Sequence, residues 1–270
     1  MKPSDKFDYG ANGYHISPGL VPDEVLEQLI VEAEAICCGH RGPVNGLPDR
    51  ANYPQESSVL NRILAIHFPH KVSPKYTDFL SYPPVVEILE QFIGPNVKCM
   101  QSLLFIKPPG MPGQAWHQDE IPIPTRDRSL TGVWVALDDA TIDNGCLWVI
   151  PGSHKPGILY ERHPHDDPRF DKTPQARDIP YDESEAVPVE ITRGSVLFFN
   201  GYLLHRSLNN VSADQSRRSL VMHYMSAESY LPWRGVEDYR DIVMVRGQDP
   251  YEHRGLVDES RAFVRDSGVA

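Results

Sequence analysis

The sequence predicts a mainly β protein whose short strands close into a jelly roll, preceded by a layer of helices. Apolar residues recur at the spacing of an amphipathic helix in two early segments, Val21–Cys37 and Pro84–Ile93. From residue 97 onward the apolar segments are short and rich in β-branched and aromatic residues, which is typical of strands. Proline and glycine number 25 and 19 in 270 residues, so the chain turns often. A jelly roll is the most economical closed form for so many short strands.

The helical layer is expected at about residues 18–94, in a single domain formed by residues 1–270. Pro22 stands at the expected first turn of the first helix, a position that proline favours. A second, shorter helix is expected at Val59–Ala65. The third helix should stop at Gly94, because a proline follows this glycine.

The β core is expected at about residues 97–226, followed by a C-terminal extension at residues 227–270. The predicted strands are Val97–Ile106, Gly132–Leu137, Cys146–Ile150, Val187–Ile191, Ser195–Phe199 and Ser219–Met225. Residues 155–186 are polar and rich in histidine, aspartate and proline. A loop of that length is usually functional, so we expect it to form a substrate lid, together with residues 40–58.

Composition and charge narrow the class of protein. Lysine and arginine number 26 and aspartate and glutamate 37, a net charge of −11, which argues against a nucleic-acid or anionic-membrane surface. No apolar run approaches the roughly 18 residues of a membrane span, and the N-terminus has no secretory signal pattern. The cysteines Cys37, Cys38, Cys99 and Cys146 lack the density of a disulfide scaffold. We therefore expect a cytoplasmic protein that binds a small molecule.

The sharpest local motif is Trp116-His117-Gln118-Asp119. In an extended segment residues i and i+2 point to one side, so His117 and Asp119 can converge on one point. His205 follows the strand at residues 195–199 and suits a strand edge facing a cavity. Two imidazoles and one carboxylate form the facial triad of non-haem Fe(II) oxygenases. The spacing alone also fits a hydrogen-bonded loop histidine beside an acid, or a zinc hydrolase site.

Arg217 adds a second signal. Strand alternation puts Arg217, Ser219, Val221 and His223 on one face, with Arg218 on the other, although a shift of one residue would exchange the two arginines. An inward arginine in a barrel strand needs an anion, and a planar guanidinium pairs well with a carboxylate. The distal carboxylate of 2-oxoglutarate is such an anion, whereas a surface arginine pair is the alternative.

Taken together, these segments resemble the phytanoyl-CoA dioxygenase family over roughly residues 10–230. The similarity lies in Asn12-Gly13-Tyr14, residues 103–109 (LLFIKPP), His117-Gln118-Asp119, residues 132–137 (GVWVAL), residues 143–154 (DNGCLWVIPGSH) and residues 205–223. The resemblance implies a double-stranded β-helix, a cupin-like core, that uses Fe(II), 2-oxoglutarate and O2. It also implies that the metal ligands, which are the catalytic residues, are His117, Asp119 and His205.

Position by position, the resemblance further implies a co-substrate site. Arg217 would bind the distal carboxylate of 2-oxoglutarate with help from Ser207. The other residues implied at this site are Trp134, Arg62, Gln101, Leu103 and Gln118. Arg62 stands where the best-known acyl-CoA-acting relatives carry lysine, so its exact role is open. Asp119 disfavours halogenation, because the halogenating relatives have a small residue at that position.

The expected function is that of an Fe(II)/2-oxoglutarate-dependent dioxygenase, an oxidoreductase that hydroxylates an unactivated C–H bond of a small molecule and releases succinate and CO2. The same cofactors also support desaturation, oxidative cyclisation or epimerisation. A non-catalytic binding module on this fold is the alternative from another class. The sequence leaves the substrate and the oligomeric state open.

Overall fold

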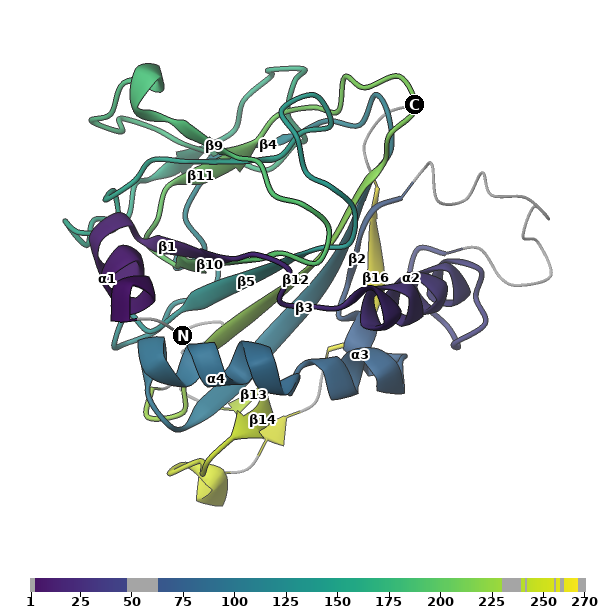
Figure 1. The fold of residues 1–270 in the computed structure, drawn as a ribbon, viewed down its shortest axis with the longest axis vertical. Coiled ribbons are helices and arrows are strands. Elements are labelled where there is room, and N and C mark those ends of the chain that lie inside the picture. Colours follow the sequence, from purple (N-terminus) through teal and green to yellow (C-terminus); the bar gives the residue numbers. More distant parts are fainter. Residues whose placement is uncertain are drawn as a thin grey trace.

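Two antiparallel sheets face each other in the computed structural model, which describes residues 3–47, 63–229, 239–240, 242–254, 256–257 and 260–266 (Figure 1). In these ranges the larger sheet has the order β1 (Tyr14–Ser17), β10 (Val196–Asn200), β5 (Thr131–Ala136), β12 (Arg217–Ser226), β3 (Val97–Lys107), β2 (Ile63–His67), β16 (Phe263–Asp266), and β14 (Val243–Arg246) also pairs with β3. The smaller sheet has the order β4 (Gln114–His117), β11 (His205–Ser207), β6 (Leu147–Val149), β9 (Val187–Val189). The predicted mainly β, double-stranded β-helix core is confirmed.

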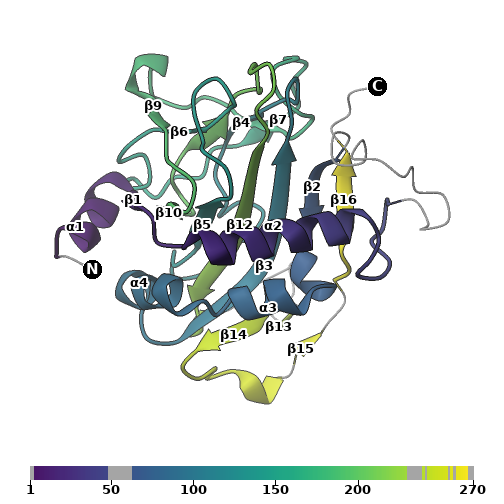
Figure 2. The ribbon, with the colours of Figure 1, turned by 45° about the vertical axis from the view of Figure 1, so that its right-hand side comes forward.

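Helices cover the outer face of the larger sheet. Figure 2 shows α2 (Asp23–Cys37), α3 (Pro74–Phe79) and α4 (Pro83–Ile93) lying together across that sheet, while α1 (Pro3–Asn12) lies beside β1. Pro22 is the N-cap of α2, which begins one residue later, and Gly94 ends α4 with a positive φ of 97°. The N-terminal helices therefore pack on the β core, as the sequence predicts.

Strand alternation divides the interior into two apolar clusters. On β12, Leu220, Met222 and Tyr224 pack among the helices on the outer face. Val221 packs between the two sheets, with residues such as Leu103. The predicted register of this strand is thus confirmed, because the residues that alternate with the outer-face set point toward the inner cavity.

The helix expected at Val59–Ala65 is wrong where it can be compared. Residues 59–62 lie outside the described part of the chain, and residues 63–65 begin strand β2. This strand pairs with β3 and β16, so it is an interior strand. Its residues Ile63 to Ile66 are all buried, which removes the alternation that marks a half-buried strand in a sequence.

Further elements lie outside the two sheets. Residues 155–186 contain the short hairpin of β7 (Arg162–His163) and β8 (Gln175–Ala176) and the 3-10 helix η4 (Glu183–Glu185). The remaining elements are η3 (Pro69–Lys71), β13 (Tyr239–Arg240), η6 (Glu252–Arg254) and β15 (Leu256–Val257). None of the helices in the described residues has the length and apolar character that crossing a bilayer requires.

Candidate active site

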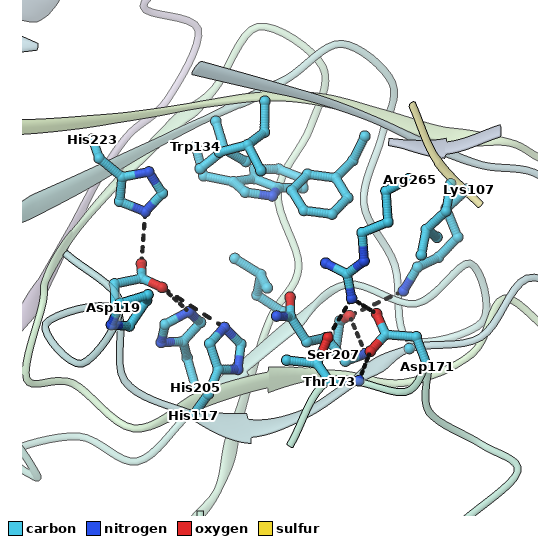
Figure 3. Close-up of a pocket in the computed structure, with 18 of the residues that line it drawn as sticks. Lys107, His117, Asp119, Trp134, Asp171, Thr173, His205, Ser207, His223 and Arg265 are labelled. Atoms are coloured by element: carbon cyan, nitrogen blue, oxygen red, sulfur yellow. Dashed lines mark hydrogen bonds and ion pairs between the residues drawn. The ribbon is translucent and has the colours of Figure 1, made fainter. Parts of the chain in front are cut away.

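The side chains of His117, Asp119 and His205 meet between the two sheets (Figure 3). His117 ends β4 and His205 begins β11, and the two residues are direct partners in this antiparallel pair. The Asp119 Oδ1 atom lies 3.8 Å from Nε2 of His117 and 3.7 Å from Nε2 of His205. One potential ligand atom from each of the three residues lies within 4.8 Å of the others, which is the spacing of a metal site.

The chemistry of these donors fits a divalent metal ion. The Nδ1 atom of His117 lies 2.7 Å from the carbonyl of Ala115, and that of His205 lies 3.0 Å from the carbonyl of Leu203. Since a carbonyl only accepts, each Nδ1 carries the proton and each Nε2 presents a lone pair to the shared centre. Burial, with a further contribution from His205, lowers the pKa of His117 to about 3, so this ring is neutral.

Asp119 is held from the larger sheet. Its Oδ2 atom lies 2.9 Å from Nε2 of His223, whose Nδ1 is 3.1 Å from the side-chain amide of Gln101. The amide nitrogen can only donate, so the His223 Nε2–H donates to Asp119. Burial alone would raise the pKa of Asp119, but the imidazoles of His223 and His205 outweigh it and hold the pKa below its ordinary value. The carboxylate is therefore ionised and oriented toward the two ligand histidines.

The segment of residues 143–154 positions His205. Its strand β6 pairs with β11 through Val149 and His205. After β6, the Ser153 hydroxyl accepts a hydrogen bond of 2.9 Å from the backbone N–H of Leu204. The residue before His205 is thereby fixed by a turn that is distant in sequence. The segment NGCLWVIPGSH therefore holds the backbone on which the candidate metal ligand His205 lies.

Two buried cations lie side by side in the same cavity. Arg217 on β12 and Lys107 on β3 are partners in the strand register, and they are 3% and 2% exposed. Neither forms an ion pair with a carboxylate in the described residues. Arg217 donates to Ser219 at 2.9 Å and lies over the Trp134 ring at 5.3 Å, while its Nε has no partner. Unpaired buried charge is costly, so this part of the cavity is suited to an anion.

Lys107 also fixes the hydroxyl of Ser207. The Lys107 Nζ donates to Ser207 Oγ at 3.0 Å and to the Leu208 carbonyl at 2.7 Å. The backbone N–H of Gln114 donates to the same Oγ at 3.2 Å. A hydroxyl has two lone pairs and one hydrogen, so the hydrogen of Ser207 is left to donate to a further group. Burial, and then the charge of Arg217, lower the pKa of Lys107 well below its ordinary value.

The cavity between the sheets has a volume of about 390 Å³. Of the site residues expected from the sequence, its walls contain His117, Asp119, His205, Arg217, Ser207, Trp134, Gln101 and Leu103. Gln118 is not among them, because its amide binds the backbone of Ile158, Tyr160 and Tyr202 instead. Arg62 lies outside the described residues.

Sequence reasoning missed Lys107. On β3, Gln101, Leu103, Phe105 and Lys107 all line the cavity. This is the two-residue period of one strand face, of which the family resemblance implies only Gln101 and Leu103. Extending the period to the end of the strand would have found Lys107.

Comparison with known proteins identifies the family. The family model described as phytanoyl-CoA dioxygenase matches residues 9–219. A phytanoyl-CoA dioxygenase of Arabidopsis thaliana is 35% identical over 167 residues, which cover 60% of this chain and 56% of the plant protein. The matched segments span 56%, 57% and 60% of the first three curated relatives.

Solved structures share the fold. The non-heme monooxygenase ThoJ has a TM-score of 0.71 at 20% identity, covering 95% of this chain and 87% of its own. The epimerase SnoN, solved in complex with Fe3+, alpha ketoglutarate and nogalamycin RO, has a TM-score of 0.64 at 19% identity, covering 84% of each chain.

The chain shares its fold with these non-haem enzymes, and its His–Asp–His cluster is a candidate metal site. The chain belongs to the phytanoyl-CoA dioxygenase family, whose model matches most of its length.

Proposed function

We propose that this chain is an Fe(II)/2-oxoglutarate-dependent dioxygenase that hydroxylates an unactivated C–H bond of a small molecule. One oxygen atom of O2 would enter the substrate and the other would enter succinate, with release of CO2. The supporting observation is that a single cavity contains both a His–Asp–His donor set and an unpaired buried arginine. We also propose a cytoplasmic location, consistent with four free cysteines.

Each side chain has a task in this proposal. His117, Asp119 and His205 would hold the metal on one face and leave the opposite face for ligands. Arg217 would bind the distal carboxylate of 2-oxoglutarate, and the Ser207 hydroxyl would donate to the same group. When bound, ferrous iron with 2-oxoglutarate and O2 supplies the oxidising power for C–H cleavage. The chain itself supplies orientation and a cavity that excludes water.

The buried cations favour this function over a zinc hydrolase with the same donors. A hydrolase requires a metal-bound water and a substrate carbonyl, and neither calls for an unpaired arginine beside the metal. The intact donor set likewise favours an enzyme over a binding module without turnover.

Succinate formation tests the proposal. The protein is purified anaerobically and loaded with Fe(II) and 2-oxoglutarate, O2 is admitted, and succinate is measured. We expect succinate from the native chain and from His154→Ala, whose histidine is outside the donor cluster, but not from His117→Ala. Equal succinate from both variants would refute the site assignment.

The mass of the product then separates the possible outcomes of the reaction. Hydroxylation adds one oxygen atom, desaturation or cyclisation removes two hydrogens, and epimerisation leaves the mass unchanged. We expect the product with one added oxygen.

A further inference from the structure

Arg162 is a cation of the cavity wall that the proposed chemistry does not use. It lies on β7, in the hairpin with β8, and is partly buried. It lines the inner cavity and also an adjoining outer hollow, which places it at the entrance. Within the described residues, its side chain has no hydrogen-bond or ion-pair partner. A partly buried guanidinium without an acceptor is an incomplete interaction.

The other cations of the wall are already accounted for. Arg265 pairs with Asp171 and Thr173, as Figure 3 shows. Arg217 and Lys107 lie beside Ser207, at the proposed co-substrate end. Among the described residues that line the cavity, this leaves Arg162 as the cation without a counter-charge or an assigned ligand.

Nearby acids do not satisfy Arg162. Glu120 lines the outer hollow, but its Oε1 atom accepts hydrogen bonds from the backbone and hydroxyl of Thr125, at 2.5 and 2.6 Å. Glu161 lies 3.7 Å from the His163 ring instead.

We propose that the substrate carries a carboxylate, which Arg162 binds at the β7 side of the cavity. This inference rests on the proposed function and specifies its substrate class. A carboxylate matches the single charge and the planar fork of one guanidinium. A phosphate monoester carries about −1.5 to −2 charges at neutral pH and would leave charge unbalanced here.

The surroundings of Arg162 also limit the rest of the substrate. Pro122 and Ile123 line the same cavity and make part of its wall apolar. The volume of about 390 Å³ is near the lower end of the roughly 300–1,000 Å³ range of ligand pockets, and 2-oxoglutarate must share it. The substrate is therefore a small carboxylic acid with an apolar body, anchored at its charged end so that a C–H bond lies near the metal.

The hairpin offers a matched control for this residue. Arg177 follows β8 directly, is exposed and does not line the cavity. Arg162→Gln and Arg177→Gln therefore each remove one positive charge from this region. Only Arg162→Gln removes it from the cavity wall.

The experiment has two arms. In the first, binding of 2-oxoglutarate to the anaerobic Fe(II) protein is measured by calorimetry for the native chain and both variants. In the second, a panel of small aliphatic and phenyl-substituted carboxylic acids is compared with the matching primary amides and with phosphate monoesters. The readouts are the shift in melting temperature and the stimulation of succinate release.

We expect equal 2-oxoglutarate affinity in all three proteins. At least one acid should bind the native chain and Arg177→Gln, and its amide should bind at least about tenfold more weakly. Arg162→Gln should lose about the same factor for the acid, with no change for the amide.

The inference is overturned if no acid binds, if acids and amides bind alike, if phosphate esters are preferred, or if the two glutamine variants behave alike. Absence of 2-oxoglutarate binding by the native chain would instead refute the proposed function, so the two failures are distinguishable.

Discussion

Replacing Arg217 by methionine should change co-substrate affinity and protein stability in opposite directions. Arg217 is 3% exposed, and its Nε has no partner. Burial lowers its pKa to about 10, so the side chain is still charged at neutral pH. In the free protein the guanidinium donates to the Ser219 hydroxyl and lies over the Trp134 ring, and it pairs with no carboxylate of the described residues. A cation over an aromatic ring stabilises the folded protein by about 0.5–2 kcal/mol. This is less than the desolvation penalty of a buried ion, which is several kcal/mol.

The magnitudes follow from this balance. Hydrogen bonds to a charged group contribute about 1.5–3 kcal/mol, so Arg217→Met should weaken 2-oxoglutarate binding roughly 10- to 150-fold. Without 2-oxoglutarate, its free energy of unfolding should be unchanged or higher by about 1 kcal/mol, because methionine fills similar space without a charge. Anaerobic calorimetry with Fe(II) measures the first quantity, and urea denaturation measures the second.

Arg218→Met is the matched control. Arg218 points to the opposite face of β12, where it binds both carboxylate oxygens of Asp138 at 2.8 Å. Its loss should cost about 0–1 kcal/mol of stability and leave the affinity for 2-oxoglutarate unchanged. A larger loss of affinity in Arg218→Met than in Arg217→Met would refute the assigned roles. A strongly destabilised Arg217→Met with native affinity would show that Arg217 is a structural residue.

Three further predictions test the surroundings of the site. His223→Phe removes the donor to Asp119 Oδ2, so Fe(II) affinity should fall about 10- to 100-fold in a metal titration; unchanged affinity would contradict the role of this contact. Burial lowers the pKa of His67 from 6.5 to about 4. Between pH 6.5 and 4 the His67 ring is protonated in the unfolded chain but not in the folded protein, so the free energy of unfolding falls as the pH drops through this range. Urea denaturation at several pH values should show a shallower fall in His67→Phe. Tyr76→Phe removes the 2.9 Å bond from α3 to the Leu29 carbonyl of α2 and should cost about 1 kcal/mol of stability at any pH from 5 to 8; a cost near zero would show that water replaces this bond.

The sequence predicted the strands β10, β5, β12 and β3 of the larger sheet and missed its strands β2 and β16. On β12 the alternation puts Arg217 and Arg218 on opposite faces but leaves open which of the two faces the site; in the structure Arg217 lines the cavity and Arg218 binds Asp138 on the other face. β2 has apolar residues on both faces, and its first three residues fall in the segment that the sequence predicts to be a helix. The strand β16, whose residues 263–266 (FVRD) carry little apolar signal, pairs with β2 from the far end of the chain. Such pairing depends on a contact distant in sequence, which local patterns do not encode.

In the site, too, features that depend on local spacing could be predicted from the sequence, whereas contacts between residues distant in sequence could not. The i, i+2 spacing of His117 and Asp119 follows from local geometry, and the structure brings the two side chains together with His205. The roles of Lys107 and His223 depend on residues distant in sequence, because Lys107 acts through Ser207 on β11 and His223 acts through Asp119 in the turn after β4. A single sequence indicates which face such residues occupy, but not which group lies opposite.

The cavity is lined partly by the two sheets and partly by the hairpin of β7 and β8. Substrate preference can therefore change at the hairpin while the metal and 2-oxoglutarate sites are kept. The strands of the two sheets carry His117, His205, Arg217 and Lys107, and Asp119 lies in the turn directly after β4. Arg162 instead comes from a two-residue strand in the segment of residues 155–186, which lies outside both sheets. Few backbone hydrogen bonds hold such a hairpin, so it tolerates substitution better than an interior strand. Changes at Arg162 should therefore alter which acid is bound while the response to 2-oxoglutarate persists, whereas changes at Arg217 should raise the 2-oxoglutarate requirement with every substrate.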